Sequence, residues 1–180
     1  MTYEQAEKTT RMFLRLAKIN LERDRSLVPV AFLFKGEECA IMGLNFPNQK
    51  AKGEMGLLIA AKAAVMGADS VLYIADAYQR TFAKEEEIVV PEGGLRNDVQ
   101  AMESVIAVWM CKDFTFTIAL PYIHTEDKYH WMDEIPLPIN RDVQVNLIPK
   151  FWDLSPEQLE TAKIAVKLFE DRGKGKGFDA

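Results

Sequence analysis

One polar segment of the chain gathers the side chains best suited to metal or acid–base chemistry. Both histidines of the protein, His124 and His130, lie between residues 123 and 134, together with carboxylates that include Asp127 and Asp133. Imidazole and carboxylate groups are common ligands of divalent metal ions, and histidine also exchanges a proton near neutral pH. His124, His130, Asp127 and Asp133 are therefore candidate metal ligands, and the two histidines are candidate catalytic groups.

The spacing of the two histidines leaves a second interpretation open. They are six residues apart, which matches no zinc signature such as HExxH and turns them well apart on a helix. The alternative is a solvated polar loop whose aromatic residues, Tyr129 and Trp131, pack onto the domain or onto a partner. We favour the loop, because unpatterned polar clusters are more often surface than active site.

A second candidate site follows the apolar run VLYIA. Asp76, Tyr78 and Arg80 come directly after it, and ligands of open α/β sheets bind beyond the carboxyl ends of strands. Tyr78 and Arg80 are candidates to bind a polar ligand, and Asp76 is a candidate catalytic base. In the alternative that we favour, Tyr78 continues the sheet surface and Arg80 pairs with an acid of the next loop, such as Glu85.

A third candidate site is the expected start of a helix. Asn48 is a plausible N-cap, and Lys50 and Lys52 follow it. Free N–H groups and the helix dipole attract phosphate at such a position, so Lys50 and Lys52 are candidate ligand-binding residues. The segment matches neither the Walker loop nor GxGxxG, and a capped, solvated first turn explains it equally well.

Cysteine content and charge restrict the class of protein. Cys39 and Cys111 are isolated in apolar stretches, which predicts buried free thiols in a reducing compartment. The formal net charge is −5, so binding to nucleic acid or to an anionic membrane is disfavoured. The N-terminus lacks the layout of a secretion signal, and no apolar run approaches the ~20 residues that span a bilayer. We expect a cytoplasmic protein, of a cell or of a virus-infected host.

The elements that must position these candidates are helices and strands in alternation. Periodicity and turn signals predict helices at 3–25, 48–66 and 155–172, and strands at 28–34, 39–46, 70–75, 102–111, 114–122 and 143–147. Long irregular stretches are expected at 79–98 and 123–141. The fold class is α+β, with a mixed, mostly antiparallel sheet of about five or six strands packed against helices in two or three layers.

The length of 180 residues suits one domain, which we place at 1–172, followed by a flexible Lys/Gly-rich tail at 173–180. Helix-end signals are clear at two places. Ser155 and Gln158 can form a capping box, and Gly67 can end the second helix in the left-handed conformation. That second helix is apolar almost all round and is expected to be heavily buried.

Two resemblances bear on the fold. The stretches Val28–Leu33, Gly67–Val71 and Asp76–Tyr78, in a helix–hairpin–helix–strand order, resemble a group of uncharacterised bacterial and phage proteins over roughly the first half of the chain. This resemblance implies a small α+β domain of bacterial or phage origin, with no assigned activity. The same order is similar to the cytidine-deaminase-like sheet, but no PCxxC motif follows, so zinc-dependent deamination is not implied.

The leading prediction is a non-enzymatic binding or accessory protein that is homo-oligomeric or has a protein partner, and that needs no cofactor. Trp131 and Trp152 lie in irregular segments, where aromatic residues often anchor interfaces. The rival is a metal-assisted hydrolase or nucleotide-processing enzyme that uses the His124–Glu134 segment, with Asp76 as a further candidate and a divalent metal as cofactor. A third possibility is phosphate-ligand binding at the two lysines of the second helix.

Overall fold

A computed structural model describes residues 1–180 except 46–48, 80–97, 99, 127, 138–147 and 175–180. The described part contains three helices, α1 (Tyr3–Asp24), α2 (Gln49–Met66) and α3 (Pro156–Lys174). Its strands are β1 (Val30–Lys35), β2 (Glu38–Gly43), β3 (Ser70–Gln79), β4 (Met102–Cys111), β5 (Thr115–His124), β6 (Tyr129–Trp131) and β7 (Ile135–Leu137). The prediction of an α+β fold is confirmed.

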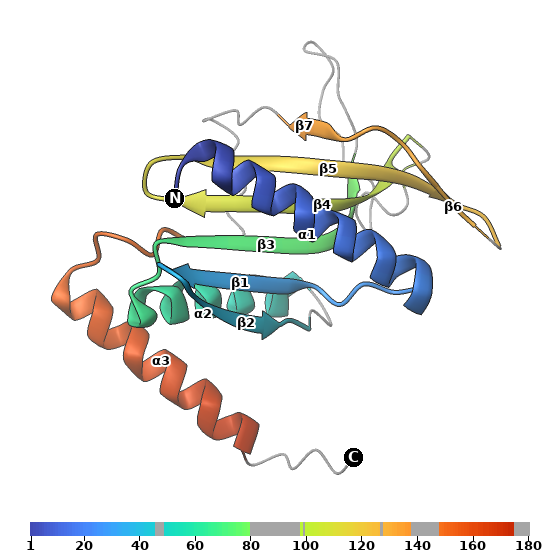
Figure 1. Ribbon diagram of the computed structural model, residues 1–180. Coiled ribbons are helices and arrows are strands. Elements are labelled where there is room, and N and C mark those ends of the chain that lie inside the picture. Colours follow the sequence, from blue (N-terminus) through green and yellow to red (C-terminus); the bar gives the residue numbers. More distant parts are fainter. Residues whose placement is uncertain (46–48, 80–97, 99, 127, 138–147, 175–180) are drawn as a thin grey trace.

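The strands form one sheet in the order β2-β1-β3-β4-β5-β6, and β7 pairs with another part of β5 (Figure 1). Every described pairing is antiparallel. The sheet is wider than expected because the stretch after His124, predicted to be irregular, returns along β5 as β6 and β7. Three-residue strands are too short to show a clear alternating pattern, which is why the sequence did not reveal them.

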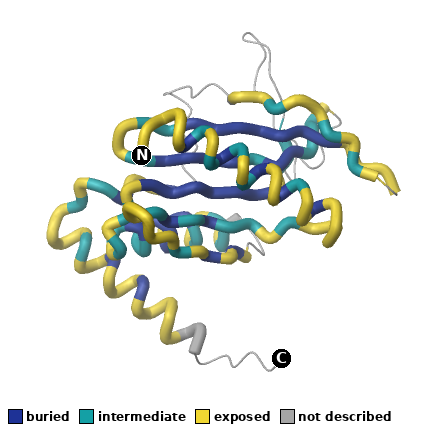
Figure 2. The backbone as a smooth tube through the Cα atoms, in the orientation of Figure 1, coloured by how far each residue is buried: buried dark blue, intermediate teal, exposed yellow. Residues whose placement is uncertain are grey.

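Alternation along the strands divides the core between the two faces of the sheet. Leu72 and Ile74 of β3 point to the face that α1 covers, where Trp109 is also completely buried. Val71 and Tyr73 point to the opposite face and pack with α2. Helix α3 packs mainly on α2 and extends away from the sheet, and Figure 2 shows that most of its surface is exposed.

The helix ends follow the signals in the sequence. The predicted capping box is present: Ser155 N–H donates to Gln158 Oε1 at 2.8 Å, and Gln158 N–H donates to Ser155 Oγ at 3.2 Å. Gly67 has φ +68° and ends α2 with a 3.0 Å bond from its N–H to Ala64 O, as in a Schellman motif. Helix α1 begins with a capping box between Thr2 and Gln5.

Some expectations need correction. Helix α2 is not buried all round, since Leu57 and Val65 are exposed. Cys39 is exposed rather than buried, because β2 is the outermost strand and carries no neighbour beyond it in the described sheet. Helix α3 continues through Lys174, two residues into the predicted tail.

The strand predicted at 143–147 and the loop at 80–97 lie outside the described residues. Among the described helices, none combines the length and the apolar character that crossing a membrane requires.

Candidate functional site

The two histidines lie on paired strands but point away from each other. His130 of β6 is the register partner of Ile123, whereas His124 is the register partner of Tyr129. Because neighbouring side chains on a strand alternate between faces, His124 and His130 project from opposite faces of the ladder. Asp133 follows β6 and is exposed, and Asp127 lies outside the described residues. Within the described part of the chain, no group of three His, Cys, Asp or Glu side chains could hold a metal ion.

His124 is in contact with the end of α1. Its ring stacks on Tyr129 at 4.4 Å between centroids. The guanidinium of Arg25, the C-cap residue of α1, lies over the Tyr129 ring at 5.4 Å and places Nη1 3.5 Å from His124 Nε2. Stacking and cation–π contacts of this kind hold a surface segment in place. His124 therefore helps to fix the β5–β6 hairpin against α1.

Trp131 makes a second set of contacts with the same helix. Its indole N–H donates to Glu22 Oε1 at 2.7 Å, and Lys18 Nζ lies 5.1 Å from the ring centroid. Trp131 also packs against Tyr122 at 5.1 Å between centroids. The face of the hairpin that carries Tyr129 and Trp131 is thus occupied by side chains of the chain itself.

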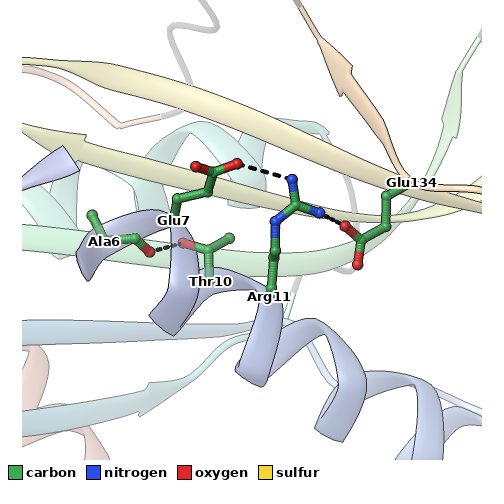
Figure 3. A network of polar contacts seen from close by, with 5 residues as sticks. All are labelled: Ala6, Glu7, Thr10, Arg11 and Glu134. Atoms are coloured by element: carbon green, nitrogen blue, oxygen red, sulfur yellow. Dashed lines mark hydrogen bonds and ion pairs between the residues drawn. The ribbon is translucent and has the colours of Figure 1, made fainter. Parts of the chain in front are cut away.

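The acids after β6 are also engaged with α1. Arg11 pairs with Glu134 and, at 2.9 Å, with Glu7 one turn earlier on the helix (Figure 3). Thr10, next to Arg11, is buried and donates its hydroxyl to Ala6 O at 2.8 Å. Glu134, one of the carboxylates that made this segment resemble a metal site, is thus part of an ion-pair network on α1.

Asp76 and Tyr78 lie on the α1 face of the sheet, where two cross-strand hydrogen bonds engage them. Tyr122 of β5 donates its hydroxyl to Asp76 Oδ1 at 2.8 Å, and Tyr78 donates to Glu103 Oε1 at 2.8 Å. Burial, followed by the hydrogen bond to Asp76, raises the pKa of the Tyr122 hydroxyl far above its usual range. Asp76 thus accepts a hydrogen bond from the Tyr122 hydroxyl, which keeps its proton. Arg80 lies outside the described residues.

Tyr122 and Glu103 were not among the candidates from the sequence. Tyr122 lies two residues before His124, and period-two alternation places these two side chains on the same face of β5. Glu103 is the second residue of the apolar strand β4, where a lone carboxylate looks like an ordinary polar strand end. Only the register, which pairs Glu103 with both Tyr78 and Tyr122, brings them together.

Lys50 and Lys52, the candidate ligand-binding residues of the third site, both lie near the start of α2. Lys50 is highly exposed and lies 3.9 Å from Glu54, one turn further along the helix. Lys52 is half-buried, and Asn48, the predicted N-cap, lies outside the described residues. A solvated first turn accounts for what is described of both lysines.

The surface that sequence reasoning missed is an apolar groove beside α1. Helix α1 lies mainly over β3 and β4, so on this face it leaves β1 only partly covered and β2 exposed. The resulting groove has a volume of about 440 Å³. Its lining is mostly apolar and comes from α1, from the segment that follows it, and from strands β1, β2 and β3. The lining residues are Phe13, Leu16, Ala17, Asn20, Asp24, Ser26, Leu27, Val28, Val30, Phe32, Ile41, Gly43 and Ile74. Phe13 and Phe32, whose ring centroids are 4.2 Å apart, form part of this lining.

The rims of the groove are apolar and exposed. Val28 is 65% exposed and Ile41 is 66% exposed on the hairpin side, and Leu16 is half-exposed on the α1 side. Large apolar side chains gathered around a concavity mark interaction sites more often than scattered ones do. The signal in the sequence for this groove was the run 28–34, which is apolar at nearly every position. Such a run predicts a strand with two apolar faces. It does not predict which of the two faces stays uncovered.

Comparisons of the chain with protein-family models, with curated proteins and with solved structures each find no match.

Proposed function

We propose that this protein is a non-enzymatic binding or accessory protein that works as a homo-oligomer and associates through the groove between α1 and the β1–β2 hairpin. The observation that carries the proposal is the exposed apolar rim of that groove, formed by Leu16, Val28 and Ile41. Covering apolar surface is the main favourable term in protein association. A second copy of the chain is the occupant that the proposal names.

The state of the polar candidates favours binding over catalysis. His124 and His130 point to opposite faces, Glu134 is held by Arg11, and Asp76 accepts a hydrogen bond from Tyr122. A metal-assisted hydrolase needs several of these groups to converge on one reacting atom. In the described arrangement His124, Glu134 and Asp76 instead contact α1 or a neighbouring strand, which supports an architectural role for these three residues.

A substitution at the groove rim tests the proposal. Ile41→Lys places a charge at an exposed position of the outermost strand, where lysine is well tolerated. We expect light scattering after size-exclusion chromatography to show an oligomer for the wild type and a shift toward monomer for Ile41→Lys. The matched control is Ile123→Lys, because Ile123 is a strand isoleucine that is 53% exposed but absent from the groove.

Two outcomes would contradict the proposal. One is a wild-type protein that stays monomeric at every concentration. The other is an oligomer that Ile41→Lys and Ile123→Lys leave equally intact, because the groove would then not be the contact. The bacterial or phage origin and the cytoplasmic location stay predictions from the sequence.

A further inference from the structure

The C-terminal helix carries more exposed apolar surface than its own fold uses. Among the side chains of α3 that the structure describes, residues 156–171, only Ala162 and Val166 are buried. Ile164 is 61% exposed, Leu168 is 56% exposed and Phe169 is half-exposed. Helix α3 packs on α2 and projects away from the sheet (Figures 1 and 2).

The positions of these residues around the helix show that a second face is apolar. With 3.6 residues per turn, Ile164 and Leu168 lie about 180° and about 140° from the midpoint of Ala162 and Val166. Together with Ala165 and Phe169 they widen the apolar arc to about 200°, whereas a helix that packs against one neighbour needs little more than about 100°. The apolar arc of α3 is therefore wider than its packing on α2 requires.

We infer that the outer arc of α3, formed by Ile164, Ala165, Leu168 and Phe169, docks into the α1–β1–β2 groove of a second copy of this chain. This inference rests on the proposed function and names the surface that fills the groove. An amphipathic helix laid into an apolar groove through residues at i, i+4 and i+5 is a common recognition mode. Each copy has both surfaces, a groove and an uncovered helix arc.

The exposed apolar arc of α3 is shorter than the groove. The α1 side of the groove extends from Phe13 to Asp24, which is about 16 Å at 1.5 Å per helical residue. The exposed apolar arc of α3, from Ile164 to Phe169, is about 8 Å long by the same rise. The helix arc therefore fits within the length of the groove.

The charges beside the two surfaces are compatible. Among the described residues that line the groove, Asp24 is the one charged group, and it is already neutralised by Arg23 through two 2.7 Å contacts. On α3, Asp171 lies about 20° from Ile164 around the helix and is exposed. Approach of the helix can place this acid near Arg23, which is highly exposed on the α1 rim and whose Nη1 takes no part in the two contacts with Asp24.

A chain cannot fill its own groove. Helix α3 packs on α2, and α2 lies on the face of the sheet opposite α1. The contact must therefore join two copies, with the helix of one in the groove of the next. With such a head-to-tail contact, every groove and every helix arc is occupied only when the copies close into a ring or into a reciprocal pair in which each copy binds the helix of the other.

Two variants test the contact, and each changes one of its two surfaces. The helix variant, Ile164→Glu with Leu168→Lys, keeps good helix-forming residues and leaves the net charge unchanged. The groove variant is Ile41→Lys, with Ile123→Lys as its control. We expect each of the two variants to weaken self-association at least about tenfold, measured by sedimentation equilibrium. Far-UV circular dichroism and thermal unfolding identify any loss of fold, and Leu168→Ala replaces the helix variant if it misfolds.

Mixing the two variants gives the decisive result. The helix variant retains an intact groove and the groove variant retains an intact helix, so the mixture is expected to form a one-to-one complex with twice the monomer mass. A helix variant that self-associates like the wild type would overturn the inference while leaving the proposed function standing. Monomeric variants whose mixture stays monomeric would also overturn it, because the two surfaces would not be complementary. A monomeric wild type would remove the proposed function itself.

Discussion

His124 and His130 belong to neighbouring strands of one hairpin, and their side chains leave it on opposite faces. The register fixes this relationship, because Ile123 pairs with His130 and His124 pairs with Tyr129. His124 instead stacks on Tyr129 at 4.4 Å, beside Arg25. The two histidines, which most suggested a metal site in the sequence, thus lie on opposite faces of the pleated sheet.

The first prediction concerns divalent metals. Because the two imidazoles cannot share one ion across the ladder, His124→Ala and His130→Ala should not change the response of the protein to zinc or manganese. The measurement is the thermal midpoint with and without each metal, compared among wild type, both single variants and the double variant. A wild-type stabilisation that either single variant abolishes would restore the metal-enzyme alternative.

The second prediction concerns the hydrogen bond from Tyr122 to Asp76. Tyr122→Phe removes a donor to a carboxylate and is expected to lower the free energy of unfolding by about 1–3 kcal/mol. The raised pKa of Tyr122 gives the pH dependence. The stabilisation is fully present below about pH 10, the ordinary range of a phenol, and is lost as the pH rises above it, because the unfolded state releases the proton first.

Urea unfolding from pH 8 to pH 11 checks this second prediction. The difference between wild type and Tyr122→Phe should be constant at the lower end and should shrink above about pH 10. Tyr73→Phe is a useful comparison, since burial alone raises the pKa of Tyr73 without an acidic partner. A difference between wild type and Tyr122→Phe that grows with pH would contradict the assigned contact.

The third prediction concerns the start of α3. Ser155→Ala removes the hydroxyl that accepts from Gln158 N–H at 3.2 Å and should cost about 1 kcal/mol of stability. Ser155→Asn provides the matched control, because asparagine caps helices about as well as serine. Denaturant unfolding of the three proteins gives the comparison, and equal losses for both variants would show that the cap hydrogen bond is unimportant.

The fourth prediction concerns the two thiols. Cys39 is exposed on β2, whereas Cys111 is half-buried and donates from Sγ to Phe114 O at 3.2 Å. Maleimide should therefore label Cys39 first in the folded protein, and mass spectrometry after proteolysis distinguishes the sites. Partial burial raises the pKa of Cys39, so its labelling should be slow at neutral pH and should accelerate in alkaline solution. Faster labelling of Cys111 would contradict the described surroundings of both residues.

Much of the fold could be predicted because local signals and tertiary packing agree. Helix α1 begins at a capping box and buries a regular stripe that includes Leu14 and Leu21. The Ser155 box and Gly67 likewise determine helix ends that the structure retains. These features depend on residues close in sequence, which single-sequence reasoning can combine.

The candidate site could not be predicted in the same way, because it depends on register and coverage. Asp76 meets Tyr122 only because β4 lies between β3 and β5 with a particular alignment. The apolar groove exists because α1 lies mainly over β3 and β4 and covers β1 only in part, and nothing in the run 28–34 specifies that choice. Neither fact leaves a pattern in the amino-acid order.

The most direct measurement of the central claim is the mass of the wild-type protein in solution across a range of concentrations. If the groove beside α1 binds a second copy, light scattering should give a mass above the 20.4 kDa of one chain that increases with concentration, and Ile41→Lys should return it toward that value. A mass that stays at one chain over the whole range would contradict the account.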